Sequence, residues 1–264
     1  MMRLALAAAL LAIPAAAQLK LAVTVVENKT GRAVTDLKPA DFKLTDDRRP
    51  RRILDAAYET TPVDAMLLVD TSLVGEVVRP AVMDLIAQIG DKEQMAIVAY
   101  DSAADLVQDF TSSKELLGNT VTGLRYGNDP RVLDALYAGI DGGFGPATLR
   151  KVAIVVTTGF EGRSGVRETE VIRMARRSGV SIYTVYATGY ERGLFESLAK
   201  ETGGAVFNLR DMSRADPKEL GKRIFDAVRG RYLVTAEGNL GLREKWKLEI
   251  GRQGRYLVSA LPLD

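Results

Sequence analysis

The chain contains the stretch Ala65-Met66-Leu67-Leu68-Val69-Asp70-Thr71-Ser72, in which an unbroken apolar run ends in an aspartate. A strand with one wet face alternates apolar and polar residues, whereas a strand of a parallel sheet, covered on both faces, is apolar throughout. The stretch therefore predicts a buried strand of a parallel sheet, with Asp70 at its carboxyl end.

Further apolar runs follow at residues 95–100, 152–156 and 182–186, and stretches with apolar residues at helical spacing separate them. Residues 106–110 alternate instead, which predicts a short antiparallel strand at the edge of the sheet. Strands and helices in alternation indicate a doubly wound, mostly parallel α/β sheet. We assign this domain to residues 61–230.

The helix expected at residues 217–229 has distinct start signals. Asp216 is a natural N-cap, Pro217 is suited to the first helical position, and Glu219 completes a capping box. We therefore expect this helix to begin directly after Asp216.

The segments on either side of this domain have β character. In residues 18–60, Leu19, Leu21 and Val23 alternate with polar or small residues, and residues 231–264 contain short strand-like segments between glycine-containing turns. We expect the two segments to pack together as one small sheet module flanking the α/β domain.

The N-terminus has the pattern of a secretory signal peptide over residues 1–17. Arg3 precedes an apolar run, Pro14 breaks the run, and Ala15-Ala16-Ala17 fits a cleavage site near Ala17. The apolar run is too short to span a bilayer. We expect an exported protein, periplasmic or extracellular, that is soluble after cleavage and has no transmembrane span.

The composition restricts the chemistry of the chain. It has no cysteine and no histidine, so thiolate nucleophiles, histidine-ligated zinc and a Ser-His-Asp triad are excluded. Any metal must be held by oxygen ligands, which favours Mg²⁺, Ca²⁺ or Mn²⁺. The net charge of +2 does not indicate nucleic acid as a partner. There is no glycine-rich dinucleotide motif or phosphate loop, which argues against a nucleotide.

Polar side chains stand where the predicted parallel strands end: Asp70 and Ser72, then Asp101, then Thr158. In an open α/β sheet, ligands bind outside the carboxyl ends of the strands, where the strand order reverses. These residues are therefore the candidate site.

Residues 66–72, Asp134-Ala135-Leu136 and residues 151–159 together resemble the von Willebrand factor A (VWA) domain. The flanking blocks at residues 33–42, 198–204 and 231–233 resemble a group of exported bacterial proteins, abundant in acidobacteria, that are called VWFA-related. The resemblance covers nearly all of the chain after residue 17. It implies a VWA fold and a role in protein binding.

The resemblance also implies a metal-ion-dependent adhesion site, in which a D-x-S-x-S loop, a distant threonine and a distant aspartate hold a divalent cation. Asp70 and Ser72 match the first two positions of that set. Val74, Pro130 and Thr158 stand at the other three, and the first two of these cannot ligate a metal. The implied site is degenerate, with Asp70 and Ser72 as a partial set of metal ligands and no cofactor expected.

Three functions remain open at this point. The first is an exported, non-enzymatic module for protein binding or assembly, with an unknown protein partner. The second is a cation-dependent adhesion domain with a rearranged site, in which nearby acids rescue Mg²⁺, Ca²⁺ or Mn²⁺ binding through water. The third is a hydrolase that pairs Asp70 with Asp101 or Glu161. The candidate binding residues are Asp70, Ser72, Asp101, Asp129, Thr158 and Glu161, with Phe144 as an exposed anchor for a partner.

Overall fold

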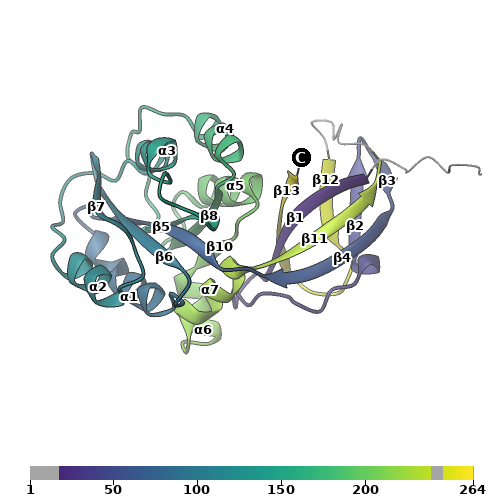
Figure 1. Ribbon diagram of the computed structural model, residues 1–264, viewed down its shortest axis with the longest axis horizontal. Coiled ribbons are helices and arrows are strands. Elements are labelled where there is room, and N and C mark those ends of the chain that lie inside the picture. Colours follow the sequence, from purple (N-terminus) through teal and green to yellow (C-terminus); the bar gives the residue numbers. More distant parts are fainter. Residues whose placement is uncertain (1–17, 239–245, 264) are drawn as a thin grey trace, which may run out of the picture.

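A six-stranded sheet in the order β10-β9-β8-β5-β6-β7 is the centre of the α/β body (Figure 1). The computed structural model describes residues 18–238 and 246–263. All neighbouring strands pair in parallel except β7, which is antiparallel to β6 at one edge. The doubly wound α/β fold is thus confirmed, whereas the predicted signal peptide lies outside the described residues. The strands are β5 (Val63–Asp70), β6 (Gln94–Tyr100), β7 (Ala104–Thr111), β8 (Arg150–Thr157), β9 (Ser181–Tyr186) and β10 (Val206–Asn208).

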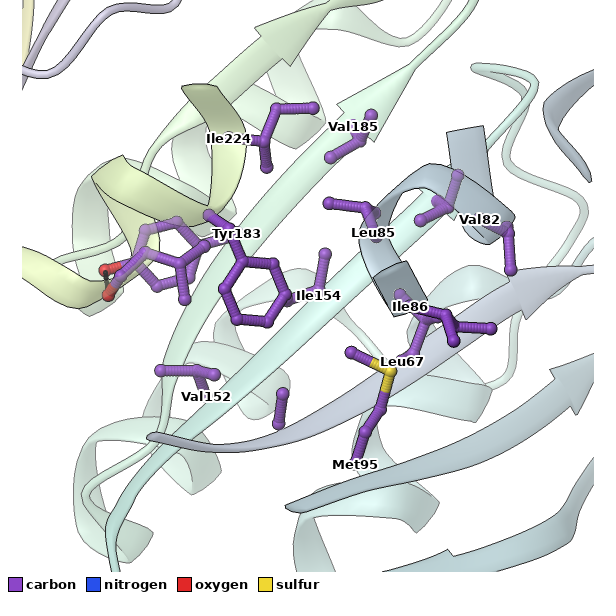
Figure 2. Packing of buried hydrophobic residues seen from close by; sticks show 14 of the residues in the cluster. Leu67, Val82, Leu85, Ile86, Met95, Val152, Ile154, Tyr183, Val185 and Ile224 are labelled. Carbon is purple, nitrogen blue, oxygen red and sulfur yellow. Dashed lines mark hydrogen bonds between the residues drawn. The ribbon is translucent and has the colours of Figure 1, made fainter. Parts of the chain in front are cut away.

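Alternate residues of β5 supply two separate cores. Leu67 faces a layer that contains α1 (Arg79–Ala87), α2 (Lys114–Thr122) and α7 (Leu220–Arg229). Figure 2 shows this layer from close by, with Leu67 among side chains of α1, α7 and the neighbouring strands. Met66 faces the opposite layer. That layer consists of α3 (Val132–Gly142), α4 (Glu168–Ser178) and α5 (Arg192–Thr202). Burial on both faces explains why β5 is apolar from Ala65 to Val69.

The start of α7 differs from the sequence-based prediction. The helix begins at Leu220, and Glu219 is its N-cap with a φ of 55°. Asp216 instead caps the carboxyl end of α6 (Leu209–Ala215). The Arg223 guanidinium donates to the carbonyls of Asp216 and Lys218, so residues 216–219 form a connecting turn rather than a helical one. Arg223 also donates to the Thr30 carbonyl at 2.7 Å, so a tertiary contact holds the guanidinium in place and overrides the capping signal here.

Both ends of the described chain form an antiparallel β module beside the α/β body, as expected (Figure 1). It contains two sheets rather than one, in the orders β13-β1-β11-β4 and β12-β2-β3, and Leu21 of β1 lies opposite Val234 of β11. Leu21, Phe42 and Tyr232 share its core. Its elements are β1 (Gln18–Glu27), η1 (Pro39–Asp41), β2 (Phe42–Asp46), β3 (Arg49–Arg51), β4 (Ile53–Thr60), β11 (Gly230–Glu237), β12 (Trp246–Ile250) and β13 (Tyr256–Leu263).

Polar contacts join the module to the α/β body. The Thr24 hydroxyl donates to the Gly203 carbonyl at 2.9 Å, and β13 packs on α5. Arg223 of α7 donates to the Thr30 carbonyl at 2.7 Å, and α7 leads directly into β11. The module is therefore anchored to the body through α5 and α7. Within the described ranges, no helix is long and apolar enough to cross a lipid bilayer.

Candidate functional site

The strand order reverses between β5 and β8, because β6 and β7 lie on one side of β5 and β8, β9 and β10 lie on the other. Such a switch point is where open α/β sheets bind ligands. Asp70 ends β5 and Thr157 ends β8, so both residues stand at this position.

The Asp70 side chain is fully buried and accepts four hydrogen bonds. Its Oδ1 accepts from the Ser72 backbone N–H at 2.9 Å. Its Oδ2 accepts from the Thr158 hydroxyl at 2.8 Å, the Thr158 N–H at 2.9 Å and the Thr157 hydroxyl at 3.2 Å. A buried carboxylate needs such partners. Protein groups alone provide them, and they join the ends of β5 and β8.

Two glycines shape the loops around Asp70. A Cβ on Gly75 would lie 2.3 Å from the Asp70 carbonyl oxygen, so only glycine fits where η2 (Gly75–Val78) begins. Gly159 has a φ of +103°, and a Cβ there would lie 2.2 Å from the Thr188 carbonyl oxygen. The chain therefore turns sharply after both strands.

Asp101, at the end of β6, is bound by its own surroundings. Its carboxylate accepts from the Asn128 side-chain amide at 2.9 Å and from the Ala103 N–H at 3.1 Å. Burial alone would raise the pKa of Asp101, but these hydrogen bonds outweigh it and hold the pKa below its ordinary value. The Asn128 carbonyl in turn accepts from the Leu73 N–H at 3.2 Å. Through Asn128, Asp101 thus holds the loop at residues 123–131 against the loop that follows β5.

Glu161 stabilises the start of α3. Its carboxylate accepts from the Val132 N–H at 2.9 Å and from the Ser164 N–H at 3.2 Å. Burial raises the pKa of Glu161, against the effect of these hydrogen bonds. Asp129 lies at the surface, and the Gly162 N–H donates to the carbonyl of the neighbouring Pro130.

Of the candidate residues, the structure joins Asp70 and Thr158 by direct hydrogen bonds and places Ser72 beside them. Among the described residues, Asp101 and Glu161 accept hydrogen bonds from their own loops and from Asn128 and Val132, and do not contact Asp70 directly. Thr157 and Asn128 also bind these acids and were not among the predicted site residues. The place of Thr157 at the end of a buried strand was a signal for it, whereas the φ of +60° at Asn128 had no signal beyond the tolerance of asparagine for that conformation.

The expectation that Phe144 is an exposed anchor is wrong. Its side chain is buried and packs against Phe110, with ring centroids 5.8 Å apart. The loop that contains it turns the chain toward β8, and Phe144 closes the core beneath α3.

The profile of the von Willebrand factor type A domain matches residues 66–220, more than half of the chain. The chain belongs to the VWA family. No curated protein matches it in sequence.

Solved VWA structures share the fold at low sequence identity. Proximal thread matrix protein 1 (PTMP1) of the mussel byssus, with a zinc-occupied adhesion site, has a TM-score of 0.55 and 14% identity over 67% of this chain and 49% of its own. A further structure of that protein has a TM-score of 0.52 and 13% identity over 76% of this chain and 50% of its own. This chain thus spans about half the length of the mussel protein. BatB of Bacteroides thetaiotaomicron has a TM-score of 0.51 and 14% identity over 63% of this chain and 98% of its own.

The residues of this VWA domain do not fit the cation site that the resemblance implies. Both Asp70 oxygens already accept hydrogen bonds, and Thr158, at the position of the distant aspartate, donates its hydroxyl to Asp70. The Val74 side chain points to solvent, and Pro130 has no side-chain oxygen. Within the described residues no group of three His, Cys, Asp or Glu side chains is arranged to hold a metal. Ser72 Oγ is buried without a hydrogen-bond partner, but a divalent cation requires several oxygen ligands, and Val74 and Pro130 supply none.

The Tyr100 hydroxyl lies near Asp70 at this site. It is buried beside Thr157 and Asp70. Burial raises the pKa of Tyr100 well above its ordinary value, and the negative charge of Asp70 raises it further. Tyr100 therefore stays neutral and adds no second charge beside Asp70.

Proposed function

We propose that this chain is an exported, non-enzymatic protein-binding or assembly module of the VWA type, whose carboxyl-end face works without a bound cation. The carboxyl-end face comprises the loops that follow β5, β6, β8 and β9. The observation that carries the proposal is the set of four hydrogen bonds that the Asp70 carboxylate accepts from Ser72, Thr157 and Thr158. These bonds hold the loops after β5 and β8 together, which is the work that a cation and its ligands do at an adhesion site.

The acids near this face support a binding role over a hydrolytic one. General acid and base catalysis by paired carboxylates needs free groups facing a common cleft. Asp70, Asp101 and Glu161 instead each accept hydrogen bonds from protein groups of the surrounding loops and strand ends. Export rests on the signal pattern of residues 1–17. N-terminal sequencing of the protein from the cell envelope should give Gln18 as its first residue.

A cation-dependent adhesion domain with a rearranged site is the second candidate. The unpartnered Ser72 Oγ beside Asp70 favours it, as does the zinc-occupied site named for the mussel PTMP1 structure. Thermal unfolding with Mg²⁺, Ca²⁺, Mn²⁺ or Zn²⁺ at millimolar concentration separates the two candidates. The cation-free module shows the same midpoint with each metal and with a chelator, whereas a rearranged site shows an upward shift.

The binding function itself is tested by crosslinking in the native envelope, in parallel samples with Mg²⁺ and with a chelator. We expect the same partner protein to be captured in both. Capture that requires the cation, or capture of no protein, would contradict the proposal.

A further inference from the structure

Exposed apolar side chains gather on the carboxyl-end face. The exposed fractions are 75% for Leu73, 56% for Val74 and 65% for Val77, which follow β5. They are 38% for Phe160, after β8, and 73% for Tyr190, after β9. We call these five residues the apolar ridge. They come from the ends of three strands that are neighbours in the sheet.

Two contacts support parts of the apolar ridge. The rings of Phe160 and Tyr190 stack with centroids 4.4 Å apart, and η2, which contains Val77, packs against β8. Phe160 directly follows Gly159, whose backbone conformation sets where the ring lies. Exposed apolar side chains that gather on one face of a domain mark an interaction site. The loop anchored on Asp70 therefore presents apolar contacts where the family's adhesion site would present a cation.

A pocket of about 500 Å³ continues the ridge beyond Tyr190. Arg210, Asp211 and Arg214 line it together with Tyr190 and Asn208. Two arginines and one aspartate are the charged residues of its lining, so the pocket has more positive charges than negative ones. Within the described part of the chain, neither arginine forms an ion pair. An arginine guanidinium binds carboxylates through paired hydrogen bonds. The pocket is thus complementary to an acidic group.

We propose that the apolar ridge and this arginine-lined pocket together bind a segment of a partner protein in which acidic residues stand next to large apolar ones. The inference rests on the proposed function and names the chemistry of its partner. An acidic side chain enters the pocket between Arg210 and Arg214, and the neighbouring apolar side chains cover Phe160 and Tyr190. The arginines repel a basic segment, and a purely polar segment does not bury the apolar side chains of the ridge.

Selection from a phage library of short random peptides against the full chain tests this. We expect enriched peptides to combine Asp or Glu with Leu, Phe, Tyr or Trp. The double variants Leu73→Ser/Val77→Ser and Arg210→Gln/Arg214→Gln should each weaken binding of these peptides by about tenfold or more. Leu106→Ser is the matched control, because Leu106 is 52% exposed but lies on β7 at the edge of the sheet.

Three results would overturn the inference. They are enrichment of basic or purely polar peptides, no enrichment at all, and binding of the enriched peptides that neither double variant weakens. The same variants, introduced into the native-envelope crosslinking, separate it from the proposed function. If wild type and both double variants capture a partner equally well, the proposed binding function stands and the inference about the ridge is wrong.

Discussion

The Thr158 hydroxyl donates a hydrogen bond of 2.8 Å to Asp70 Oδ2, at the position where the VWA adhesion site has a second acidic ligand. An aspartate at this position would repel Asp70 in the absence of a metal, whereas the threonine donates hydrogen bonds to it. The substitution and the geometry agree, because threonine supplies both its hydroxyl and its backbone N–H to the same oxygen.

Thr158→Val should lower the free energy of unfolding by about 1–3 kcal/mol, the usual loss when a hydrogen bond to a buried charged group is removed. Urea denaturation measures it. Thr158→Ser keeps the hydroxyl and is the control, with an effect well below that of valine. Equal stabilities of the valine variant and the wild type would show that the Thr158 N–H and the Thr157 hydroxyl suffice for Asp70.

The double variant Val74→Ser/Thr158→Asp should acquire a cation response. A second carboxylate beside the buried Asp70 is repulsive without metal, so its thermal midpoint in chelator should fall below that of the wild type. Millimolar Mg²⁺ or Mn²⁺ should recover part of that loss through binding to the folded state. The wild type, measured side by side, should not respond. A double variant equally indifferent to metal would mean that the loops cannot assemble a ligand set.

Gly159→Ala should destabilise the fold by about 2–3 kcal/mol, since alanine is strained at this φ and its Cβ would meet the Thr188 carbonyl. Gly189→Ala, on the next loop, is the matched control, because nothing lies within 4 Å of a Cβ there. Chemical denaturation of both variants compares them. If both lose the same stability, the turn after β8 does not need glycine.

Glu93→Gln should lower the free energy of unfolding by about 3 kcal/mol near neutral pH, because it leaves the partly buried Arg229 guanidinium unpaired. Glu93 also accepts from the N–H groups of Val63 and Gly90. Asp226→Asn, which removes the exposed partner of Lys222, is the control and should cost less than about 1 kcal/mol.

The same carboxylate predicts a pH dependence. Burial alone would raise the pKa of Glu93, but the hydrogen bonds from Arg229 and Gly90 hold it below the ordinary 4.5. The unfolded chain therefore takes up the proton first as pH falls, so this stability is present above 4.5 and is lost as pH falls through the folded pKa. Unfolding free energies measured at several acidic pH values should fall less steeply for Glu93→Gln than for the wild type. Parallel slopes would contradict the assignment.

Much of the fold could be predicted because it depends on local pattern. The apolar run that ends in Asp70 indicates a strand covered on both faces, and the alternating residues 106–110 indicate an edge strand. The N-terminus of α7 could not be predicted in this way. Arg223 binds the carbonyls of the preceding turn, and the first helical residue is Leu220. The burial of Phe144 could not be predicted either, because it depends on contact with Phe110 of β7, which is distant in the sequence.

The sequence by itself determined the parallel sheet, the polar residues at its carboxyl edge, and the loss of ligand oxygens at Val74 and Pro130, since periodicity and residue chemistry are properties of short segments. Only the tertiary structure decided what Asp70 does. Asp70 and Thr158 are 88 positions apart, and only the pairing of β5 with β8 brings them to hydrogen-bonding distance. The apolar ridge was equally hidden, because the loops that form it come together only where the strands of the sheet end side by side.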